Sequence, residues 1–317
     1  MGDTLRLGFG KSSWITSIAL FSLLGSMSMG LAQGTGVVTL NAAALYPEGP
    51  LAADGGVYYA EMGRDSVLFS DNQRTRPIWA SSGCGPTAVS NYGSDFVVLC
   101  HRTGILAVIS TEGETRRIIS RDSRGRPFPT PNASDSDRRG GVYFSSSGQF
   151  APGAAATGAV LYLDAAGTVR RVAEGIHYAN GVTLSRDGSR LYVSEHLSRN
   201  ILAYAVAADG SLRQPRIHLS LDSLVSPDPD RGWDVGPDGL ATDRKGNLYI
   251  AEYGAGRLLI VGPDRQLLKL IEVEGRYITA PALSPDEKTI YITAPSARDP
   301  NRPGTVLAIA NPLSVVQ

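Results

Sequence analysis

Residues 180–195 read NGVTLSRDGSRLYVSE, and this stretch contains the unit that recurs along the whole chain. A short apolar run follows Asn180 and leads into the turn Asp187-Gly188, which suits a tight reversal because Gly adopts positive φ without steric cost. A strand of β-branched and aromatic residues, Leu191-Tyr192-Val193, comes next. The stretch therefore predicts a β-hairpin that opens on a polar residue.

The same unit recurs six times, at intervals of about 45 residues, as expected for a repeat protein. Set on one phase, the six copies begin with Glu48-Gly49-Pro50, Cys84-Gly85-Pro86, Pro131-Asn132-Ala133, Asn180-Gly181-Val182, Asp238-Gly239-Leu240 and Ala280-Pro281-Ala282. A second hairpin follows the first, so each copy supplies four antiparallel strands. This pattern predicts an all-β fold, a six-bladed β-propeller. A β-sandwich is the competing fold, but it does not explain polar residues at one phase of a repeat.

The last copy ends one strand short, after the strand Val306 to Ile309. We expect Val37 to Leu40 to supply the missing strand, so that an N-terminal strand closes the ring and leaves no exposed sheet edge. Residues 33–317 are thus expected to form a single six-bladed propeller domain.

Residues 1–32 are typical of a cleavable signal peptide, with Arg6 and Lys11 ahead of an apolar run from Trp14 to Leu24. Small residues at Gly30-Leu31-Ala32 offer a cleavage site, although an uncleaved membrane anchor is the alternative. We expect an exported chain, periplasmic or secreted, with no membrane contact after cleavage. The chain has 30 Lys plus Arg and 30 Asp plus Glu, a balance that indicates no nucleic-acid partner. Its oligomeric state stays open.

Four copies carry an oxygen-bearing side chain at the same phase, 10 to 12 residues before the aromatic residue of the next strand. We call these four the anchor residues: Glu48, Asn132, Asn180 and Asp238. If each opens the innermost strand of its blade, all four ring the mouth of the central channel. The alternative is that they only start strands by bonding nearby backbone.

The anchor residues offer hard oxygen ligands from Glu48, Asn180 and Asp238, with Asn132 as a possible fourth. Such donors suit one divalent cation, Ca²⁺ first, with Mg²⁺, Zn²⁺ or Mn²⁺ also possible. A cation at a channel mouth can polarise a carbonyl and acidify a bound water, while a nearby carboxylate takes the proton. The site would therefore hydrolyse a small-molecule lactone, a related ester or a phosphoester.

Residues at the end of each second strand should reach the same mouth, and both long segments, 148–158 and 214–236, should lie on that face. The candidates for substrate contact there, together with Asn132, are His101, Glu195, His196, Tyr253 and Cys84. Each His is more often a rim residue without a catalytic role. We expect Cys84 to line the wall, since no base accompanies its thiol.

The two cysteines, Cys84 and Cys100, are compatible with one disulfide in an oxidising compartment. Cys100, however, ends the apolar strand Phe96-Val97-Val98-Leu99. A buried free thiol is therefore the expectation.

These motifs resemble the gluconolactonase, regucalcin and luciferin-regenerating-enzyme family of six-bladed propellers. The matching pieces are Pro47-Glu48-Gly49-Pro50, Pro131-Asn132, Asn180-Gly181-Val182 and Pro237-Asp238-Gly239-Leu240. The resemblance implies one divalent metal held by Glu48, Asn180 and Asp238, with Asp238 as general base and Asn132 at the substrate. Family members often carry Arg two residues before the third anchor and Asp after it, where this chain has Thr130 and Ala133.

Three functions are therefore compatible with the sequence. The first is a metal-dependent lactone or ester hydrolase with Asp238 as general base. The second is a non-catalytic ligand-binding propeller with structural Ca²⁺. The third is a propeller with phosphotriesterase-like or strictosidine-synthase-like chemistry, because a fold does not fix a function.

Overall fold

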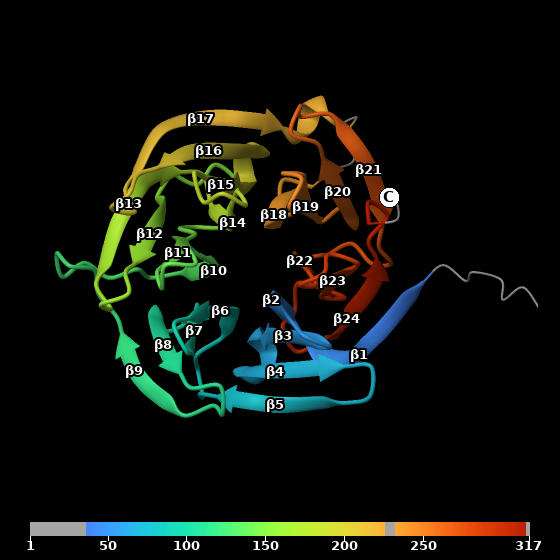
Figure 1. The fold of residues 1–317 in the computed structure, drawn as a ribbon, viewed down its shortest axis with the longest axis horizontal. Coiled ribbons are helices and arrows are strands. Elements are labelled where there is room, and N and C mark those ends of the chain that lie inside the picture. Colours follow the sequence, from blue (N-terminus) through green and yellow to red (C-terminus); the bar gives the residue numbers. More distant parts are fainter. Residues whose placement is uncertain (1–35, 226–231, 315–317) are drawn as a thin grey trace, which may run out of the picture. The chain divides into compact units, whose positions relative to one another are not determined.

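Six four-stranded antiparallel sheets surround a central axis in a computed structural model of the chain, which describes residues 36–225 and 232–314 (Figure 1). Each sheet is one blade, and the blades are numbered 1 to 6 from the sheet that starts with β2. The expected all-β six-bladed propeller is confirmed. The predicted signal at residues 1–32 lies outside the described residues. Among those described, no helix is long and apolar enough to cross a membrane.

The strands of the first three blades run in chain order from the axis outward. Blade 1 consists of β2 (Pro47–Ala53), β3 (Gly56–Glu61), β4 (Ser66–Asp71) and β5 (Thr75–Ala80). Blade 2 consists of β6 (Pro86–Tyr92), β7 (Asp95–Cys100), β8 (Ile105–Ile109) and β9 (Thr115–Ile119). Blade 3 consists of β10 (Pro131–Ser136), β11 (Val142–Ser146), β12 (Gly158–Leu163) and β13 (Val169–Ile176).

The next two blades repeat this order, and the sixth borrows a strand. Blade 4 consists of β14 (Ala179–Leu184), β15 (Arg190–Glu195), β16 (Asn200–Val206) and β17 (Leu212–Ser220). Blade 5 consists of β18 (Gly236–Thr242), β19 (Leu248–Tyr253), β20 (Arg257–Val261) and β21 (Leu267–Glu272). Blade 6 consists of β22 (Ala280–Leu283), β23 (Thr289–Ala294), β24 (Pro303–Ala310) and β1 (Val37–Leu45). Short 3₁₀ turns are η1 (Met62–Arg64), η2 (His196–Ser198) and η3 (Leu221–Ser223).

The N-terminal strand β1 closes the ring by pairing antiparallel with β24, the last strand of the chain. The pairing starts at Val37 opposite Ile309 and ends at Leu45 opposite Pro303. The predicted closing strand is confirmed, and it extends five residues beyond Leu40. Every blade thereby has four strands.

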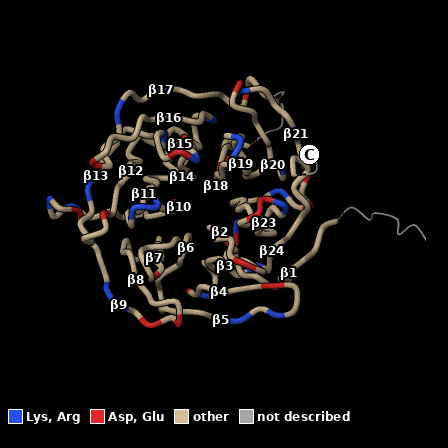
Figure 2. The backbone as a smooth tube through the Cα atoms, in the orientation of Figure 1, with Lys and Arg blue, Asp and Glu red and all other residues tan. Residues whose placement is uncertain are grey.

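The hydrophobic core lies between neighbouring blades and not at the axis. Each of the six buried clusters combines side chains from two adjacent sheets, as Leu99 of β7 packs with Phe144 and Leu161 of blade 3. Charged positions mark the outer strands β5, β9 and β17 (Figure 2). Sheets packed face to face around the ring hold the six innermost strands in fixed positions.

The two long segments differ from each other in the structure. Residues 148–157 contain no strand, as predicted. The segment from Gln214, expected to be irregular, instead begins inside β17, because residues from Arg216 to Ser220 pair with β16. The run Pro227-Asp228-Pro229-Asp230 lies outside the described residues.

Candidate functional site

The innermost strands β2, β10, β14 and β18 carry the four anchor residues at their starts, around the axis (Figure 1). In each of these strands the pairing register shifts just after the anchor, for example between Pro131 and Ser134 or between Pro237 and Leu240. Such a bulge turns a side chain out of the pleat and re-aims it. The repeat therefore directs one polar side chain from each of these blades toward the centre.

Direct contacts join the anchor residues into one group. Asn132 donates from Nδ2 to Oδ1 of Asn180 at 3.0 Å and to Oγ of Ser147 at 2.8 Å. Asn180 lowers the pKa of the Asp238 carboxyl, and the negative charge of Asp238 raises the pKa of Glu48, so these side chains lie close together. The structure therefore brings together all four residues that the repeat phase singled out.

The carboxylates of Glu48 and Asp238 lie close enough to affect each other's protonation. Burial and the negative charge of Asp238 raise the pKa of Glu48 well above its usual range. Burial likewise raises the pKa of Asp238, which is 7% exposed, and hydrogen bonds from Asn180 and the Gly239 amide only partly offset that effect. Across residues 36–225 and 232–314, neither carboxylate has an ion pair with a basic side chain.

This donor set fits a hard divalent cation. A buried carboxylate beside a half-buried one, without a counter-charge, is costly unless a cation neutralises the pair. An amide oxygen has two lone pairs, so Asn180 Oδ1 can accept from Asn132 and still bind a cation. No group of three His, Cys, Asp or Glu side chains with metal-binding geometry occurs in the described part of the chain, so amides must complete the ligand set.

Three tyrosines surround the carboxylates, and sequence reasoning identified only Tyr253. Tyr46 and Tyr178 each stand two residues before an anchor, and both have positive φ, at 51° and 59°. The hydroxyls of Tyr46 and Tyr253 lie 3.0 Å apart. Burial and the negative charge of Asp238 and Glu48 raise the pKa of all three phenols, so they stay protonated donors. For Tyr46 and Tyr178, the shared spacing of two residues before an anchor was the sequence signal that could have placed them at the site.

The carbonyl that precedes three of the anchors is contacted from the neighbouring blade. The contacts are Thr279 Oγ1 to Pro47 O at 2.9 Å, Thr87 Oγ1 and His101 Nδ1 to Pro131 O at 3.2 and 3.1 Å, and His196 Nδ1 to Pro237 O at 3.1 Å. Burial lowers the pKa of His196 to about 4, so its ring is neutral at physiological pH. Burial also lowers the pKa of His101.

The remaining predicted substrate contacts lie near this group. Oε1 of Glu195 accepts from the backbone N–H of His177 at 3.2 Å, and its Oε2 accepts from Asn200 at 3.2 Å. His196 packs edge-on against Phe150, whose ring centroid is 5.3 Å away. Substrate contact by His101, Glu195, His196 and Tyr253 stays a prediction.

Blades 2 and 6 carry different anchor-phase residues from those expected. In blades 1, 3, 4 and 5 the anchor lies three residues before the partner of the tyrosine in the second strand. The same count from Tyr291 in blade 6 gives Thr279, and from Val97 in blade 2 it gives Thr87. A Cβ added to Gly49, Gly181 or Gly239 would strike the carbonyl of Thr87, Asp238 or Thr279, which supports the same equivalence. The assignment of Cys84 and Ala280 to this phase was wrong.

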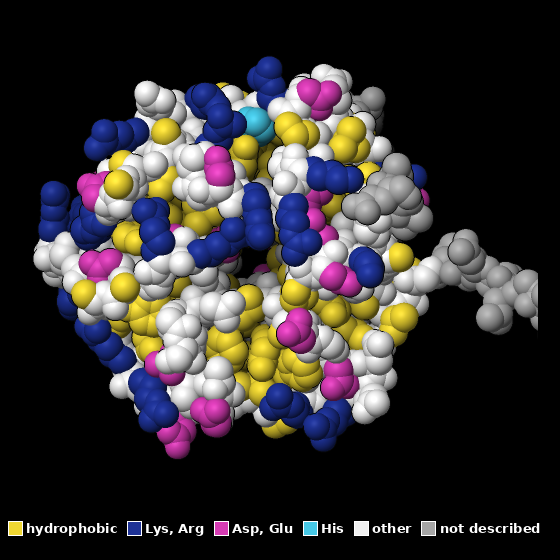
Figure 3. Space-filling view, in the orientation of Figure 1, with side chains coloured by type: hydrophobic (Ala, Val, Ile, Leu, Met, Phe, Trp, Pro, Cys, Tyr) yellow, Lys and Arg dark blue, Asp and Glu magenta, His cyan; other side chains and the backbone are white. Residues whose placement is uncertain are grey.

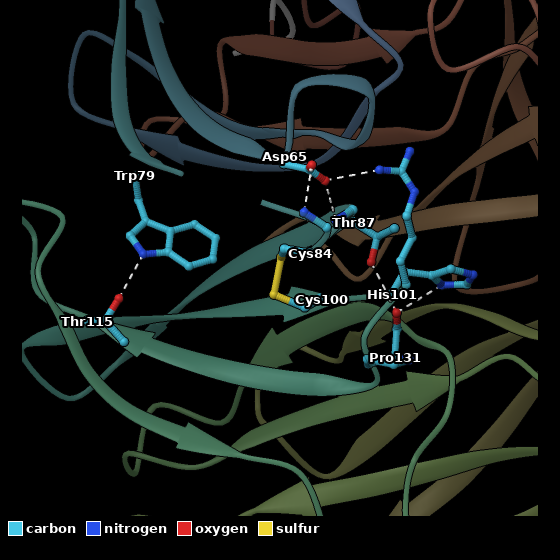
Figure 4. Close-up of a disulfide and its surroundings, with 11 residues drawn as sticks. Asp65, Trp79, Cys84, Thr87, Cys100, His101, Thr115 and Pro131 are labelled. Carbon is cyan, nitrogen blue, oxygen red and sulfur yellow. Dashed lines mark hydrogen bonds and ion pairs between the residues drawn. A yellow bond between two sulfur atoms is a disulfide. The ribbon is translucent and has the colours of Figure 1, made fainter. Parts of the chain in front are cut away.

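Cys84 and Cys100 form a disulfide, so the expectation of a buried free thiol was wrong (Figure 4). Cys100 pairs with Pro86 across the two strands, and this brings its Cα to 4.6 Å from that of Cys84. Both side chains are buried in the cluster between blades 1 and 2. Cys84 therefore offers no thiol to a substrate.

A cavity of about 730 Å³ lies along the axis beyond the anchor residues. Its lining includes residues that follow the anchors, such as Gly49 and Ala133, and reaches Arg138 and Arg186 in the hairpin turns. The anchors themselves are not in the lining, so they mark its inner end. Figure 3 shows the central opening on one face, with Lys and Arg side chains gathered beside it.

Comparison with known proteins adds a family and a set of relatives. Residues 46–296 match the family described as SMP-30/Gluconolactonase/LRE-like region. The chain is 27% identical over 243 residues to lactonase drp35 of Staphylococcus aureus, covering 71% of each chain. A solved gluconolactonase of Xanthomonas campestris superposes with a TM-score of 0.70 at 22% identity, covering 87% of this chain and 89% of that one. The calcium-binding protein regucalcin of Agrobacterium tumefaciens gives 0.68 at 18% identity, covering 86% and 92%.

Proposed function

The chain belongs to the SMP-30/gluconolactonase/LRE-like family, and from this premise we propose that it is a divalent-metal-dependent hydrolase of a lactone or related ester. The observation that carries the proposal is the pair of half-buried Glu48 and buried Asp238, grouped with two amides and without a basic partner in the described residues. The relative named lactonase drp35 supports the activity. The solved relative named as a calcium-binding protein supports Ca²⁺ as the first metal to test.

In this proposal Glu48, Asn180 and Asp238 hold the cation. When bound, the cation supplies Lewis acidity toward the substrate carbonyl and toward water. Zn²⁺, Mg²⁺ and Mn²⁺ suit the same oxygen donors and are tested alongside Ca²⁺.

In the proposed reaction, Asp238 transfers the proton and other side chains of the site contact the substrate. Asp238 takes a proton from water as the water oxygen bonds to the lactone carbonyl carbon. The ring C–O bond then breaks, and the proton passes to the leaving alkoxide, which gives a hydroxy acid. The neutral phenols of Tyr46, Tyr178 and Tyr253 would donate hydrogen bonds to substrate oxygens. Asn132 donates both Nδ2 protons to Asn180 and Ser147, so it would contact substrate through Oδ1, as the acceptor of a substrate hydroxyl.

Export to the periplasm or the cell exterior belongs to the same proposal. The Cys84–Cys100 disulfide supports it, because structural disulfides persist in oxidising compartments. The predicted signal at residues 1–32 gives the second argument.

The test is metal analysis of the purified protein together with a panel of sugar, aliphatic and aromatic lactones, run with and without EDTA. We expect hydrolysis that EDTA abolishes and that added cation restores. Asp238→Asn should lower kcat about 10²- to 10⁴-fold, the usual contribution of a general base, while the protein still folds. Hydrolysis that survives both EDTA and Asp238→Asn would contradict the mechanism. Metal binding with a silent panel would favour a ligand-binding propeller.

A further inference from the structure

Thr279 occupies the anchor phase of blade 6, which lies in the ring between the blade of Asp238 and the blade of Glu48. We propose that Thr279 is a positioning residue that fixes the separation of these two carboxylates and thereby sets the affinity of the site for its cation. The inference rests on the proposed function, because it concerns the same site.

The hydroxyl of Thr279 reaches blade 1. Its Oγ1 lies 2.9 Å from Pro47 O, the carbonyl directly before Glu48. The same hydroxyl also lies 3.2 Å from Thr293 O, so Pro47 O is the nearer of its two carbonyl partners. The contact with Pro47 O therefore ties blade 6 to the residue directly before Glu48.

The backbone of Thr279 reaches blade 5. Its carbonyl accepts from the N–H of Gly239 at 2.7 Å, directly after Asp238. A side chain at position 239 would strike Thr279 O and Ala280, so glycine permits this close approach. One residue therefore contacts the immediate neighbour of each carboxylate, from opposite sides.

Thr279 is itself held rigidly. It is fully buried, its N–H donates to Thr293 O at 2.9 Å, and its Oγ1 lies 2.8 Å from Thr293 Oγ1. The Thr279 hydroxyl thus lies between Pro47 O of blade 1 and the Thr293 hydroxyl of its own blade, and these contacts fix its place on both sides. A fixed donor with no solvent to compete for it restricts where Glu48 can lie relative to Asp238.

Thr87 provides a matched control at the same phase of blade 2. Its hydroxyl also contacts a carbonyl before an anchor, Pro131 O, at 3.2 Å. Blade 2 lies between Glu48 and Asn132, however, and only one of those side chains is charged. Loss of the Thr87 hydroxyl should therefore leave the spacing of the two carboxylates unchanged.

The experiment measures cation affinity of the metal-free full chain by isothermal titration calorimetry with Ca²⁺, and with Mn²⁺ and Zn²⁺ in parallel. Thr279→Val, which keeps the shape and removes the hydroxyl, should weaken affinity about 10- to 100-fold, the usual effect of losing a partner of a metal ligand. The cation affinity of Thr279→Ser should stay within about threefold of the wild type, because serine keeps the hydroxyl. The affinity of Thr87→Val should stay within the same range, because Thr87 does not lie between the two carboxylates. Lactone turnover by Thr279→Val should recover at saturating cation, which a general packing defect would not allow.

Two further measurements keep the outcomes distinct. Melting in EDTA checks that each variant is folded; if Thr279→Val does not melt cooperatively, Thr293→Val replaces it, with a loss of affinity expected. Unchanged affinity in the variant used, or an equal loss in Thr87→Val, overturns the role of Thr279 while lactone hydrolysis by the wild type stands. A wild type that binds none of the three cations overturns this inference together with the proposed function.

Discussion

The Cys84–Cys100 disulfide joins the entrance of the innermost strand of blade 2 to the end of its second strand, across a sequence separation of 16. We predict that the double variant Cys84→Ala, Cys100→Ala is destabilised. In the chain-entropy model, a loop of this length contributes about 3 kcal/mol through the unfolded state. Each sulfur is also buried in the cluster with Val67 and Trp79, and its removal should cost about 1 kcal/mol more.

The assay is thermal unfolding followed by circular dichroism, without reductant. For a domain of this size, 1 kcal/mol shifts Tm by roughly 2–4 °C, so the double variant should melt on the order of 10 °C below the wild type. Val89→Ala, in the same cluster and away from the bond, serves as the control for lost packing alone. A double variant that melts within about 2 °C of the wild type would refute the loop-closure reasoning.

Three further predictions concern the metal, a glycine and a histidine. Ca²⁺ at 100 times its Kd should stabilise the chain by about 2.7 kcal/mol in a melting experiment, and Asp238→Asn should abolish this shift. Gly181→Ala should lower Tm and weaken Ca²⁺ binding in calorimetry, since its Cβ would strike the Asp238 carbonyl. Gly188→Ala, whose Cβ would meet no atom within 4 Å, should leave Ca²⁺ binding unchanged. Burial, with Arg265, Arg190 and Arg216 nearby, lowers the pKa of His218 to about 4; protonation between pH 6.5 and 4 therefore favours unfolding. The wild type should therefore lose free energy of unfolding as the pH falls from 6.5 to 4, and His218→Gln should lose about 1–2 kcal/mol less over this range in urea titrations. The same pH dependence in both proteins would contradict the prediction.

The fold could be predicted because its signals are local. Alternating strands and Asp-Gly turns specify each hairpin, and six copies on one phase leave a propeller as the fold that uses them all. The anchor residues could be predicted for the same reason, because equivalent positions of the repeat lie at equivalent positions around the propeller axis.

The errors at Thr87 and Thr279 have different causes. Alignment on Gly-Pro matched Pro86 with Pro50, whereas strand pairing matches Pro86 with Pro47, the residue before an anchor. Reading Pro-X as the repeat element would have found Thr87. Thr279 has no proline before it, so its position follows only from the pairing of β22 with β23.

The missed disulfide and tyrosines depended on three-dimensional placement. Cys100 looks like an ordinary strand residue until Pro86 is placed opposite it. Tyr46 and Tyr178 reach the site from left-handed backbone positions, which bulky residues seldom adopt. Their shared place two residues before an anchor was the one local signal, and it does not show where the side chains point.

The pairing of β1 with β24 also governs when the protein can be complete. Val37 meets Ile309 only after every intervening blade has been made, so the two edges of the unfinished ring stay unpaired throughout synthesis. Non-local contacts of this kind form late in folding. The ring can therefore close only after β24 has left the ribosome and paired with β1. This last pairing also fixes blade 6, and Thr279 with it, between Glu48 and Asp238.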